Sequence, residues 1–175
     1  MDIAIAETFQ YCPMCAAAAE IHGENPFRCQ ACGHVHHFGP VTAVAAIVAD
    51  SVGQILLLKR ARDPGQGKWG LPGGFVDANE TAESALIREV REEVNLELVQ
   101  MRYLYSFPNS YLYRGVTIPV TDLFYFGRIA SFEEMTAQPG EIESWHFCHP
   151  TETELAQMAF PSNRSALELF LANVD

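Results

Sequence analysis

The sequence predicts an α/β domain preceded by a small metal-binding segment, and three observations point to this. Four of the five cysteines fall within the first 32 residues, as two closely spaced pairs. Beyond residue 40, short runs rich in β-branched residues, typical of strands, surround a helical stretch with an apolar stripe. With 175 residues, 49% of them hydrophobic and 19% charged, the chain can bury one sizeable core and is not disordered as a whole.

The cysteine pairs form the pattern Cys-x2-Cys-x13-Cys-x2-Cys and predict a structural zinc site. Four thiolates complete the tetrahedral coordination that Zn²⁺ prefers. The alternatives are two disulfides or a redox pair, but thiols are expected to be reduced in the cytosol. The predicted zinc ligands are Cys12, Cys15, Cys29 and Cys32. Three nearby histidines are alternative ligands: His34, His36 and His37. Because four cysteines are available, we expect these histidines not to bind the metal. The remaining thiol, Cys148, reads as a small buried residue.

We expect residues 1–38 to form a zinc ribbon, in which short strands bridge two loops that each carry a cysteine pair. A segment this short should depend on the metal for folding. Its apolar surface is expected from Phe9, Tyr11, Phe27 and Val35. Gly39 and Pro40 then form a hinge into a second domain, residues 41–175.

The second domain is expected to open with two strands. Residues 41–49 are apolar and β-branched, as in a buried strand, and residues 54–60 follow after a turn at 50–53. We expect these two strands to pair as a hairpin. A loop over residues 61–67 and a glycine-rich approach over residues 69–74 then lead into a helix.

The helix should begin near Glu80, with Asn79 as its N-cap. Its apolar stripe consists of Leu86, Ile87, Val90 and Val94. Asn95 should end it, because asparagine tolerates the left-handed conformation of a C-cap. The elements expected after it are strands at 98–106, 116–129 and 141–148, a turn near Arg114 and Gly115, and helices at 153–158 and 162–173, the last with Ser162 as N-cap.

Three glutamates on this helix predict a cation site. Glu89 shares one face with Glu92 and Glu93, since residues three and four apart are neighbours on a helix. Such carboxylates repel one another and cost helix stability. A hard divalent cation relieves the repulsion and takes oxygen ligands. Taken alone, the same pattern also fits a solvated charged face.

The stretch from residue 74 to residue 96 resembles the signature of the Nudix hydrolases. The matching positions are Gly74, Glu80, Arg88, Glu89, Val90, Glu92, Glu93 and Leu96. One departure is Asn95, which stands where glycine is usual and for which the left-handed conformation is inexpensive. The resemblance implies an α/β/α sandwich over residues 41–175, with a mixed sheet between helices.

Nudix enzymes hydrolyse a nucleoside diphosphate linked to a further moiety, with the help of divalent cations, usually Mg²⁺ or Mn²⁺. The resemblance assigns metal binding to Glu89, Glu92 and Glu93, with Gly74 lending a carbonyl oxygen. It implies that Arg88 orients a nearby carboxylate, and Glu92 is within reach at i+4. The alternative for Arg88 is a plain surface ion pair.

The general base of such a site is expected from a glutamate outside the helix, or from one of the glutamates within the signature. Glu141 and Glu143 flank Ile142 at the start of a predicted strand, at a place where glutamates of relatives reach the metal cluster. We favour Glu141, which completes a catalytic set with Arg88, Glu92 and Glu93. Two weaker candidates lie in a polar connection: Glu133 and Glu134.

A zinc ribbon ahead of a Nudix signature is similar to the NADH pyrophosphatases. Their downstream Ser-Gln-Pro-Trp-Pro-Phe-Pro-x-Ser array is matched only in part by residues 105–111, so ADP-ribose or another ADP-containing dinucleotide stays open beside NAD(H). Aromatic side chains in and just after this stretch are candidates for stacking on adenine: Tyr105, Phe107, Tyr111 and Tyr113. Alternation along a strand would instead turn every second one into the core.

The net charge of −11 argues against a general nucleic-acid binder, although a bound cation allows a phosphorylated substrate. Residues 1–10 lack the features of a signal peptide, and no apolar run reaches about 18 residues, so we expect a cytoplasmic protein without a membrane span. A homodimer is expected by analogy with relatives. The alternative function is a nucleotide-sensing module without turnover, against which the intact carboxylates argue.

Overall fold

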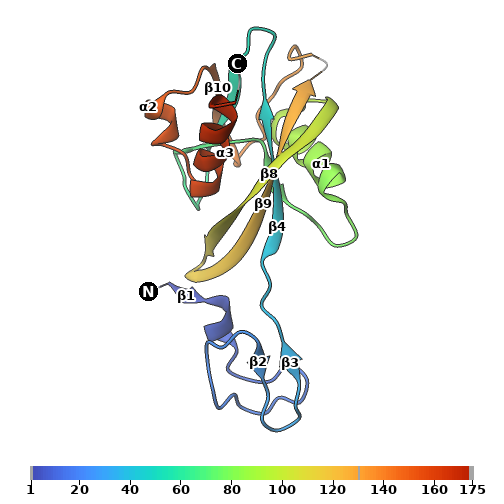
Figure 1. The fold of residues 1–175 in the computed structure, drawn as a ribbon, viewed down its shortest axis with the longest axis vertical. Coiled ribbons are helices and arrows are strands. Elements are labelled where there is room, and N and C mark those ends of the chain that lie inside the picture. The colour runs from blue at the N-terminus through green and yellow to red at the C-terminus, as the bar shows by residue number, and fades with distance from the viewer. Residues whose placement is uncertain (1, 130, 174–175) are drawn as a thin grey trace. The chain divides into compact units, whose positions relative to one another are not determined.

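The structure, a computed structural model, describes residues 2–129 and 131–173 (Figure 1). Its contacts divide the chain into two compact units, Met1–Val41 with Ser110–Val120 and Thr42–Asn109 with Thr121–Asp175. The predicted division into residues 1–38 and 41–175 stays a prediction. Among the described helices, none combines the length and apolar character that crossing a membrane requires.

The first unit contains very short elements around a small core. They are β1 (Ile3–Ala4), a 3₁₀ turn (Ile5–Thr8), β2 (Phe27–Arg28) and β3 (Val35–His36). β2 and β3 are antiparallel, and β1 pairs in parallel with the part of β9 that belongs to this unit, through Ile3 and Val116. Phe27 and Phe38 are buried and the Phe9 ring packs against both, whereas Tyr11 is 65% exposed. Tyr11 therefore adds little to the apolar core expected of it.

The described part of the second unit contains two sheets and three helices. In this unit the larger sheet has the order β9-β4-β7, with β8 paired to β9, and the smaller has the order β10-β5-β6. The strands are β4 (Val41–Val48), β5 (Ile55–Arg60), β6 (Trp69–Gly70), β7 (Gly73–Phe75), β8 (Leu98–Tyr113), β9 (Val116–Ile129) and β10 (Ile142–Cys148). The helices are α1 (Ala82–Val94), α2 (Glu152–Leu155) and α3 (Pro161–Leu171).

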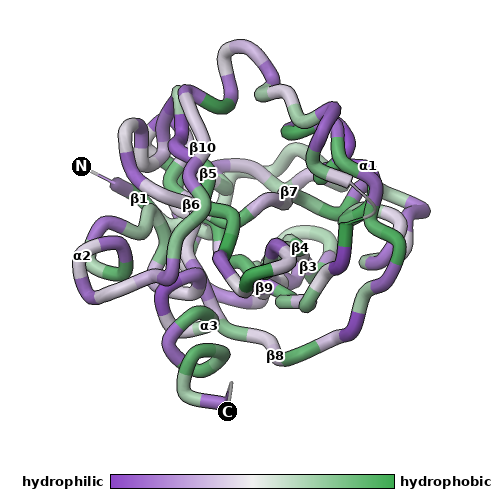
Figure 2. The backbone as a smooth tube through the Cα atoms, turned by 90° about the horizontal axis from the view of Figure 1, so that it is seen from above, coloured by the Kyte–Doolittle hydropathy of each residue, from purple (hydrophilic) through white to green (hydrophobic). Residues whose placement is uncertain are grey.

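Strands β4 and β5 are buried on both faces, which places them in the middle layer. In β4, Val44 and Ala46 pack in one cluster with α1, whereas Ala45 and Ile47 pack in another with α2 and α3. Figure 1 shows α1 on one side of β4 and α2 and α3 on the other. Figure 2 shows hydrophobic residues along β5, and alternating hydrophobic and hydrophilic turns in α3. The predicted α/β/α sandwich is confirmed.

The expectation that the first two strands form a hairpin is wrong. β4 and β5 belong to different sheets, and only one bridge, between Ala49 and Ile55, joins them. The turn itself forms, because the Asp50 carboxylate accepts the N–H groups of Val52 and Gln54. Each strand satisfies its backbone with other partners, β4 with β7 and β9, and β5 with β6 and β10. The β-branched pattern predicted the strands but not their pairing.

The expected N-cap of α1 is also wrong, whereas its C-cap is confirmed. Asn79 has a left-handed φ of 69°, and the helix instead begins after Thr81, whose hydroxyl accepts the Ser84 N–H at 3.1 Å. At the other end, Asn95 has φ 53° and ψ 39°, the left-handed C-cap that was predicted. Its amide also donates to the Glu134 carbonyl.

The other boundaries shift by a few residues. β8 runs on to Tyr113, and the predicted turn follows at Arg114 and Gly115, both with positive φ. α3 has Phe160 as N-cap and Pro161 in its first turn, so Ser162 is not the cap. The Ser162 hydroxyl instead donates to the buried carboxylate of Asp122. A buried acceptor on β9 therefore takes the hydroxyl that local sequence assigns to the helix end.

Candidate active site and metal centre

A buried carboxylate on α1 faces the glycine pair of β7. Glu93 is 6% exposed, and its Oε2 accepts the Gly73 N–H at 2.8 Å. Burial raises the pKa of Glu93 to about 8, although the Gly73 N–H opposes this. A side chain at Gly73 would collide with β4, since its Cβ would lie 2.0 Å from the Val44 carbonyl oxygen. The glycine thus lets β7 pair with β4 while its N–H meets the carboxylate.

Glu89 lies directly against the backbone of Gly74. A Cβ built on Gly74 would lie 2.5 Å from the Glu89 Cδ atom, so a side chain at this position would displace the Glu89 carboxylate. Burial raises the pKa of Glu89, and the hydrogen bond from Arg88 opposes the rise. The contact places a carboxylate beside the main chain of β7, as a metal site shared between them requires.

Arg88 joins the loop before α1 to the face that carries the carboxylates. Its Nε and Nη2 donate to the two oxygens of Glu80 at 3.0 and 2.9 Å, a bidentate pair. Its Nη1 donates to Glu89 at 2.7 Å, and Nη2 also donates to the Phe75 carbonyl. The Arg88 side chain is 28% exposed and the Glu80 and Glu89 side chains 16% each, so this is more than a surface ion pair.

Two features of this network differ from the expectation. The Arg88 Nη1 atom lies 3.4 Å from the Glu92 carboxylate, which is farther than the contacts of Arg88 with Glu80 and Glu89. The Glu92 side chain is also 53% exposed. Arg88 therefore orients mainly Glu80 and Glu89. Glu80 is outside the helix, accepts the Asp77 N–H and has its pKa lowered by the hydrogen bond from Arg88. Glu80 therefore holds the loop before α1, although the helix was expected to begin near it.

Glu141 is the predicted base that the structure brings towards this cluster. Its charge raises the pKa of both Glu89 and Glu93, as a minor effect beside burial. It forms an ion pair of 2.6 Å with Arg62. Glu143 is instead paired with Lys59 at 2.9 Å. Both glutamates are ion-paired, and the effect of Glu141 on the pKa values of Glu89 and Glu93 is what favours it over Glu143.

The carboxylate cluster includes one cation that sequence reasoning missed. Arg60, on β5, lowers the pKa of Glu93 by its charge, donates from Nε to the Pro64 carbonyl and lies over the Phe160 ring at 5.1 Å. Nothing in the local sequence connects it with a helix thirty residues further on. Asp122, a carboxylate within the apolar run of β9, was also missed, although an acidic residue between buried positions is itself a signal.

The predicted base contacts on β8 lie on the other side of the sheet from α1. Tyr105 and Phe107 pack with the α2 and α3 cluster, and the Tyr105 hydroxyl donates to the Ala166 carbonyl at 2.6 Å. Burial raises the pKa of Tyr105 to about 12. The structure does not bring these rings to the α1 carboxylates, which agrees with the alternative that alternation turns them inward. Tyr111 belongs to the first unit.

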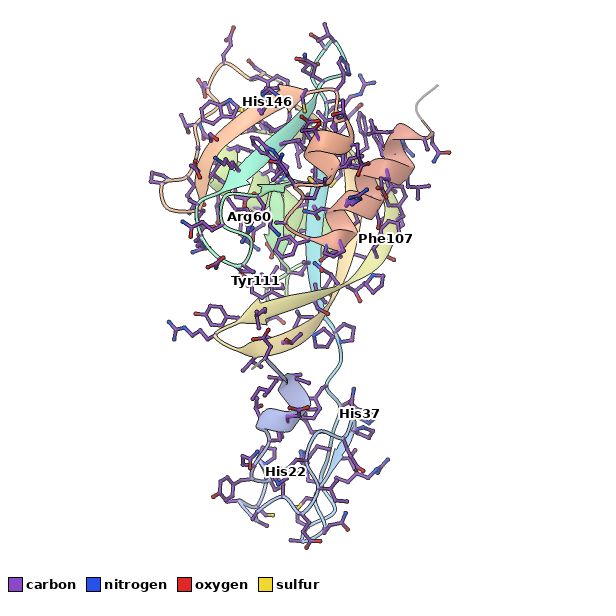
Figure 3. All side chains as sticks on the ribbon, turned by 90° about the vertical axis from the view of Figure 1, so that its left-hand side faces the viewer. His22, His37, Arg60, Phe107, Tyr111 and His146 are labelled. Atoms are coloured by element: carbon purple, nitrogen blue, oxygen red, sulfur yellow. The ribbon has the colours of Figure 1, made fainter. Side chains whose placement is uncertain are left out.

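The four cysteines form a compact cluster in the first unit. Their sulfur atoms all lie within 4.8 Å of one another, and none is joined in a disulfide. Within the described part of the chain, they are the one group of three or more His, Cys, Asp or Glu side chains gathered this closely. The histidines that follow are outside the group, among them His37, which is labelled in Figure 3.

Both cysteine pairs have the same backbone shape. The Ala16 N–H donates to the Cys12 carbonyl at 2.9 Å, and the Gly33 N–H donates to the Cys29 carbonyl at 3.0 Å. Ala16 and Gly33 both have positive φ, 59° and 75°. Each pair therefore forms a tight turn that presents two sulfur atoms to one point, as tetrahedral coordination requires.

The thiols compete for ionisation. The backbone N–H of Cys32 lowers the pKa of Cys29 to about 7. The backbone of His34 favours the Cys32 thiolate, yet the neighbouring thiol of Cys15, burial and the other cysteines together raise the Cys32 pKa to about 12. Four thiolates cannot coexist at this distance without a cation, which fits a zinc ion.

A family model described as NUDIX domain matches residues 39–170. The chain belongs to the NUDIX domain family. A protein named NAD-capped RNA hydrolase NudC from Stutzerimonas stutzeri is 28% identical over 93% of this chain and 56% of its own length. An ADP-ribose pyrophosphatase from Methanocaldococcus jannaschii is 40% identical over 40% of this chain and 42% of its own length. The chain thus spans about half the length of the curated relatives it matches.

Solved structures agree with this membership of the NUDIX domain family. A MutT NUDIX hydrolase from Burkholderia pseudomallei aligns with a TM-score of 0.58 at 28% identity, over 74% of this chain and 97% of that one. A NUDIX hydrolase from Nitrosomonas europaea has the same fold, with a TM-score of 0.68 over 93% of this chain and 90% of that one, at 22% identity. The second alignment supports the fold alone.

Proposed function

We propose that this Nudix protein is a metal-dependent pyrophosphohydrolase that cleaves the diphosphate of a nucleoside diphosphate linked to another moiety. The observation that carries the proposal is the position of Glu89 and Glu93 against the Gly73–Gly74 backbone, with Arg88 fixing Glu89. Burying Glu93 and partly burying Glu89 beside a third carboxylate, Glu92, costs stability that a solvated charged face would not incur. A divalent cation offsets that cost.

The chemistry of the donor set fits such a cation, because carboxylate and main-chain oxygens are its preferred ligands. We assign Glu89, Glu92 and Glu93, with the Gly74 carbonyl, to Mg²⁺ or Mn²⁺. When bound, the cation neutralises the diphosphate charge and lowers the pKa of the attacking water. The charge of Glu141 acts on both Glu89 and Glu93, and we assign Glu141 to accept the proton of that water. Glu141 must first leave its ion pair with Arg62. Arg88 positions Glu89 through its hydrogen bond.

NAD(H) or ADP-ribose is the substrate class that the relatives support. Their names describe an NAD-capped RNA hydrolase and an ADP-ribose pyrophosphatase. The net charge of −11 favours a small dinucleotide over a long nucleic acid. Tyr105 and Phe107 support the α3 side of the domain rather than touch the base, and Tyr111 stays a proposed base contact.

We further propose that residues 1–38 are a zinc ribbon with a structural Zn²⁺ on Cys12, Cys15, Cys29 and Cys32. The matched turns and the competing thiol pKa values support it. Zinc thiolates and free thiols are compatible with a reducing, cytoplasmic location. A homodimer is proposed by analogy with relatives, and sedimentation velocity tests it.

A substrate panel with matched variants tests the enzymatic proposal. NADH, NAD, ADP-ribose, diadenosine polyphosphates and nucleoside triphosphates are offered with Mg²⁺ or Mn²⁺, and release of AMP and phosphate is measured. We expect turnover of NADH or ADP-ribose, abolished in Glu92→Gln and Glu93→Gln and kept in the control Glu168→Gln, an exposed glutamate of α3. Normal turnover in either active-site variant would refute the ligand assignment.

The alternative candidate function is that of a nucleotide-sensing module that binds its ligand without turnover. It predicts tight binding of ADP-ribose or NADH, by calorimetry, with no turnover of any compound in the panel. That result would replace the enzymatic proposal.

A further inference from the structure

Two arginines near the start of β8 and the end of β9 line a hollow that has no part in the carboxylate site. They are Arg102 on β8 and Arg128 on β9, two strands that pair with each other. The hollow has a volume of about 500 Å³, and the rest of its lining is Gln100, Met101 and Phe126. All five residues belong to the second unit. We call this feature the arginine hollow.

Neither guanidinium has a partner among the residues that the structure describes. No ion pair or hydrogen bond joins the Arg102 or Arg128 side chain to any of them. By contrast, four other cations are ion-paired: Lys59, Arg62, Arg88 and Arg164. In a protein with a net charge of −11, two unpaired arginines on one hollow leave a local positive charge that favours an anion between them. The guanidinium fork matches the geometry of phosphate oxygens.

A second, largely apolar hollow adjoins the first. Its volume is about 630 Å³, and it shares Phe126 and Arg128 with the arginine hollow. Phe132 and Phe147 also line it, both are half-buried, and their rings lie edge to face at 5.0 Å. The carboxylate on its lining, that of Asp50, already accepts two N–H groups of its own turn. Aromatic side chains offer a contact surface to a flat apolar ligand, so we call this feature the phenylalanine hollow.

The two hollows are separate from the carboxylate site. Their linings include none of the glutamates of α1 and neither glycine of β7. The Phe126 ring stacks on Phe170 of α3 at 5.6 Å. The charge of Arg102 lowers the pKa of Tyr105 against the larger effect of burial. Because Tyr105 and Phe126 pack with the cluster of α2 and α3, the arginine hollow lies on the other side of the sheet from α1 and its carboxylates.

We propose that the two hollows form a second site, which binds a nucleoside monophosphate. The phosphate oxygens accept hydrogen bonds from Arg102 and Arg128, and the base lies in the phenylalanine hollow. Arg128, which lines both hollows, sets the phosphate beside the base. A dianionic phosphate has acceptors for two guanidinium groups at once, and each hollow has the volume of a small-molecule site. The site stands independently of the proposed hydrolysis, although AMP, a product of that reaction, has the required chemistry.

The test follows the arginine Nε–H resonances of the full chain by NMR, in buffer without Mg²⁺ and Mn²⁺. Arg102→Gln and Arg128→Gln each remove one resonance and thereby assign it. AMP should shift both resonances to saturation in wild type, and each variant should need about tenfold more AMP to saturate the remaining one. Inorganic phosphate and adenosine should each need about tenfold more than AMP, because each fills one hollow only. The control Arg114→Gln, an exposed arginine in the turn between the same strands, should keep the wild-type response.

The outcomes separate this inference from the proposed function, since no titration contains a divalent cation or measures turnover. Selective weakening in Arg102→Gln and Arg128→Gln supports the second site, even if the substrate panel shows no turnover. No response of either resonance to AMP overturns it, even in a protein that hydrolyses ADP-ribose. Saturation by inorganic phosphate at the same concentration as AMP overturns the nucleotide, because the base then adds nothing. Equal weakening in Arg114→Gln overturns the role of the two arginines.

Discussion

Arg88 is the residue on which the candidate site most depends. It donates to Glu80 through two nitrogens, to Glu89 through a third contact and to the Phe75 carbonyl. A planar guanidinium can serve all these acceptors at fixed angles, whereas a lysine ammonium is a point donor. The sequence predicted a single partner at i+4, but the loop brings Glu80 closer. The position of this loop against α1 is set by tertiary packing, which helical i+4 spacing does not describe.

We predict that Arg88→Lys and Arg88→Ala both lower kcat by about 10- to 100-fold and raise the Mg²⁺ concentration needed for half-maximal rate. The reason is that Glu89 loses the hydrogen bond that holds it beside Gly74. Steady-state kinetics across a Mg²⁺ titration measure both effects. The control is Arg164→Ala, which removes an arginine with two ion pairs, to Glu152 and Glu168, far from the carboxylates in sequence. Full activity in Arg88→Lys would contradict the geometric role.

Glu93 should make the stability of the protein fall with rising pH in buffer free of Mg²⁺ and Mn²⁺. Its folded pKa of about 8 lies above the ordinary value of 4.5. Below about pH 4.5 the carboxyl is protonated in both states, so its contribution is fully present. Between pH 4.5 and 8 the unfolded chain ionises first, and stability is lost. Melting temperatures from pH 5 to 8 measure the slope.

The matched variants for this pH effect are Glu93→Gln and Glu168→Gln. Glu93→Gln is neutral at every pH and should flatten the slope, and added Mg²⁺ should flatten it in wild type, since a cation favours the ionised carboxylate. Glu168→Gln, on the exposed face of α3, should keep the wild-type slope. An unchanged slope in Glu93→Gln would show that other groups titrate.

At the scale of elements, the sequence predicted most of what depends on periodicity and little of what depends on pairing. The C-cap at Asn95 and three members of the predicted apolar stripe of α1, Leu86, Val90 and Val94, follow from local chemistry and are confirmed. The fourth, Ile87, is 43% exposed and does not belong to the buried stripe. The separation of β4 from β5 depends on which strands reach them from elsewhere in the chain. The same holds for Asp122, whose hydrogen-bond partner Ser162 lies 40 residues further along the chain. Long-range contacts carry no local signature.

The N-cap of α1 is a position where residue preference alone does not decide between two candidates. Both Asn79 and Thr81 are good caps by residue type, but Asn79 has a left-handed φ and the Thr81 hydroxyl accepts the Ser84 N–H. We predict that Thr81→Ala lowers the free energy of unfolding by about 1 kcal/mol. Asn79→Gly should change it by only a few tenths, since glycine accepts positive φ. Urea unfolding of both variants decides, and the reverse order would restore Asn79 as the cap.

On the scale of the whole molecule, each unit has its own core and its own candidate metal. The first packs Phe27 and Phe38 around two cysteines, and the second packs its strands between α1 and α3. The first core is small, so most of its stability should come from zinc coordination. The second buries a full set of aliphatic side chains on both faces of β4 and β5. Loss of zinc should therefore affect the two units unequally.

We predict that a zinc chelator speeds hydrogen exchange in residues 2–38, while α1 (residues 82–94) keeps its protection. Exchange followed by mass spectrometry measures both regions in one experiment. Cys12→Ser should reproduce the effect without chelator and reduce the zinc content, because one ligand of four is lost. Cys148→Ser, which alters the one cysteine outside the cluster, should leave zinc content and exchange unchanged. Equal acceleration in α1 would show that the second unit also depends on zinc, and no acceleration in residues 2–38 would refute a structural zinc site.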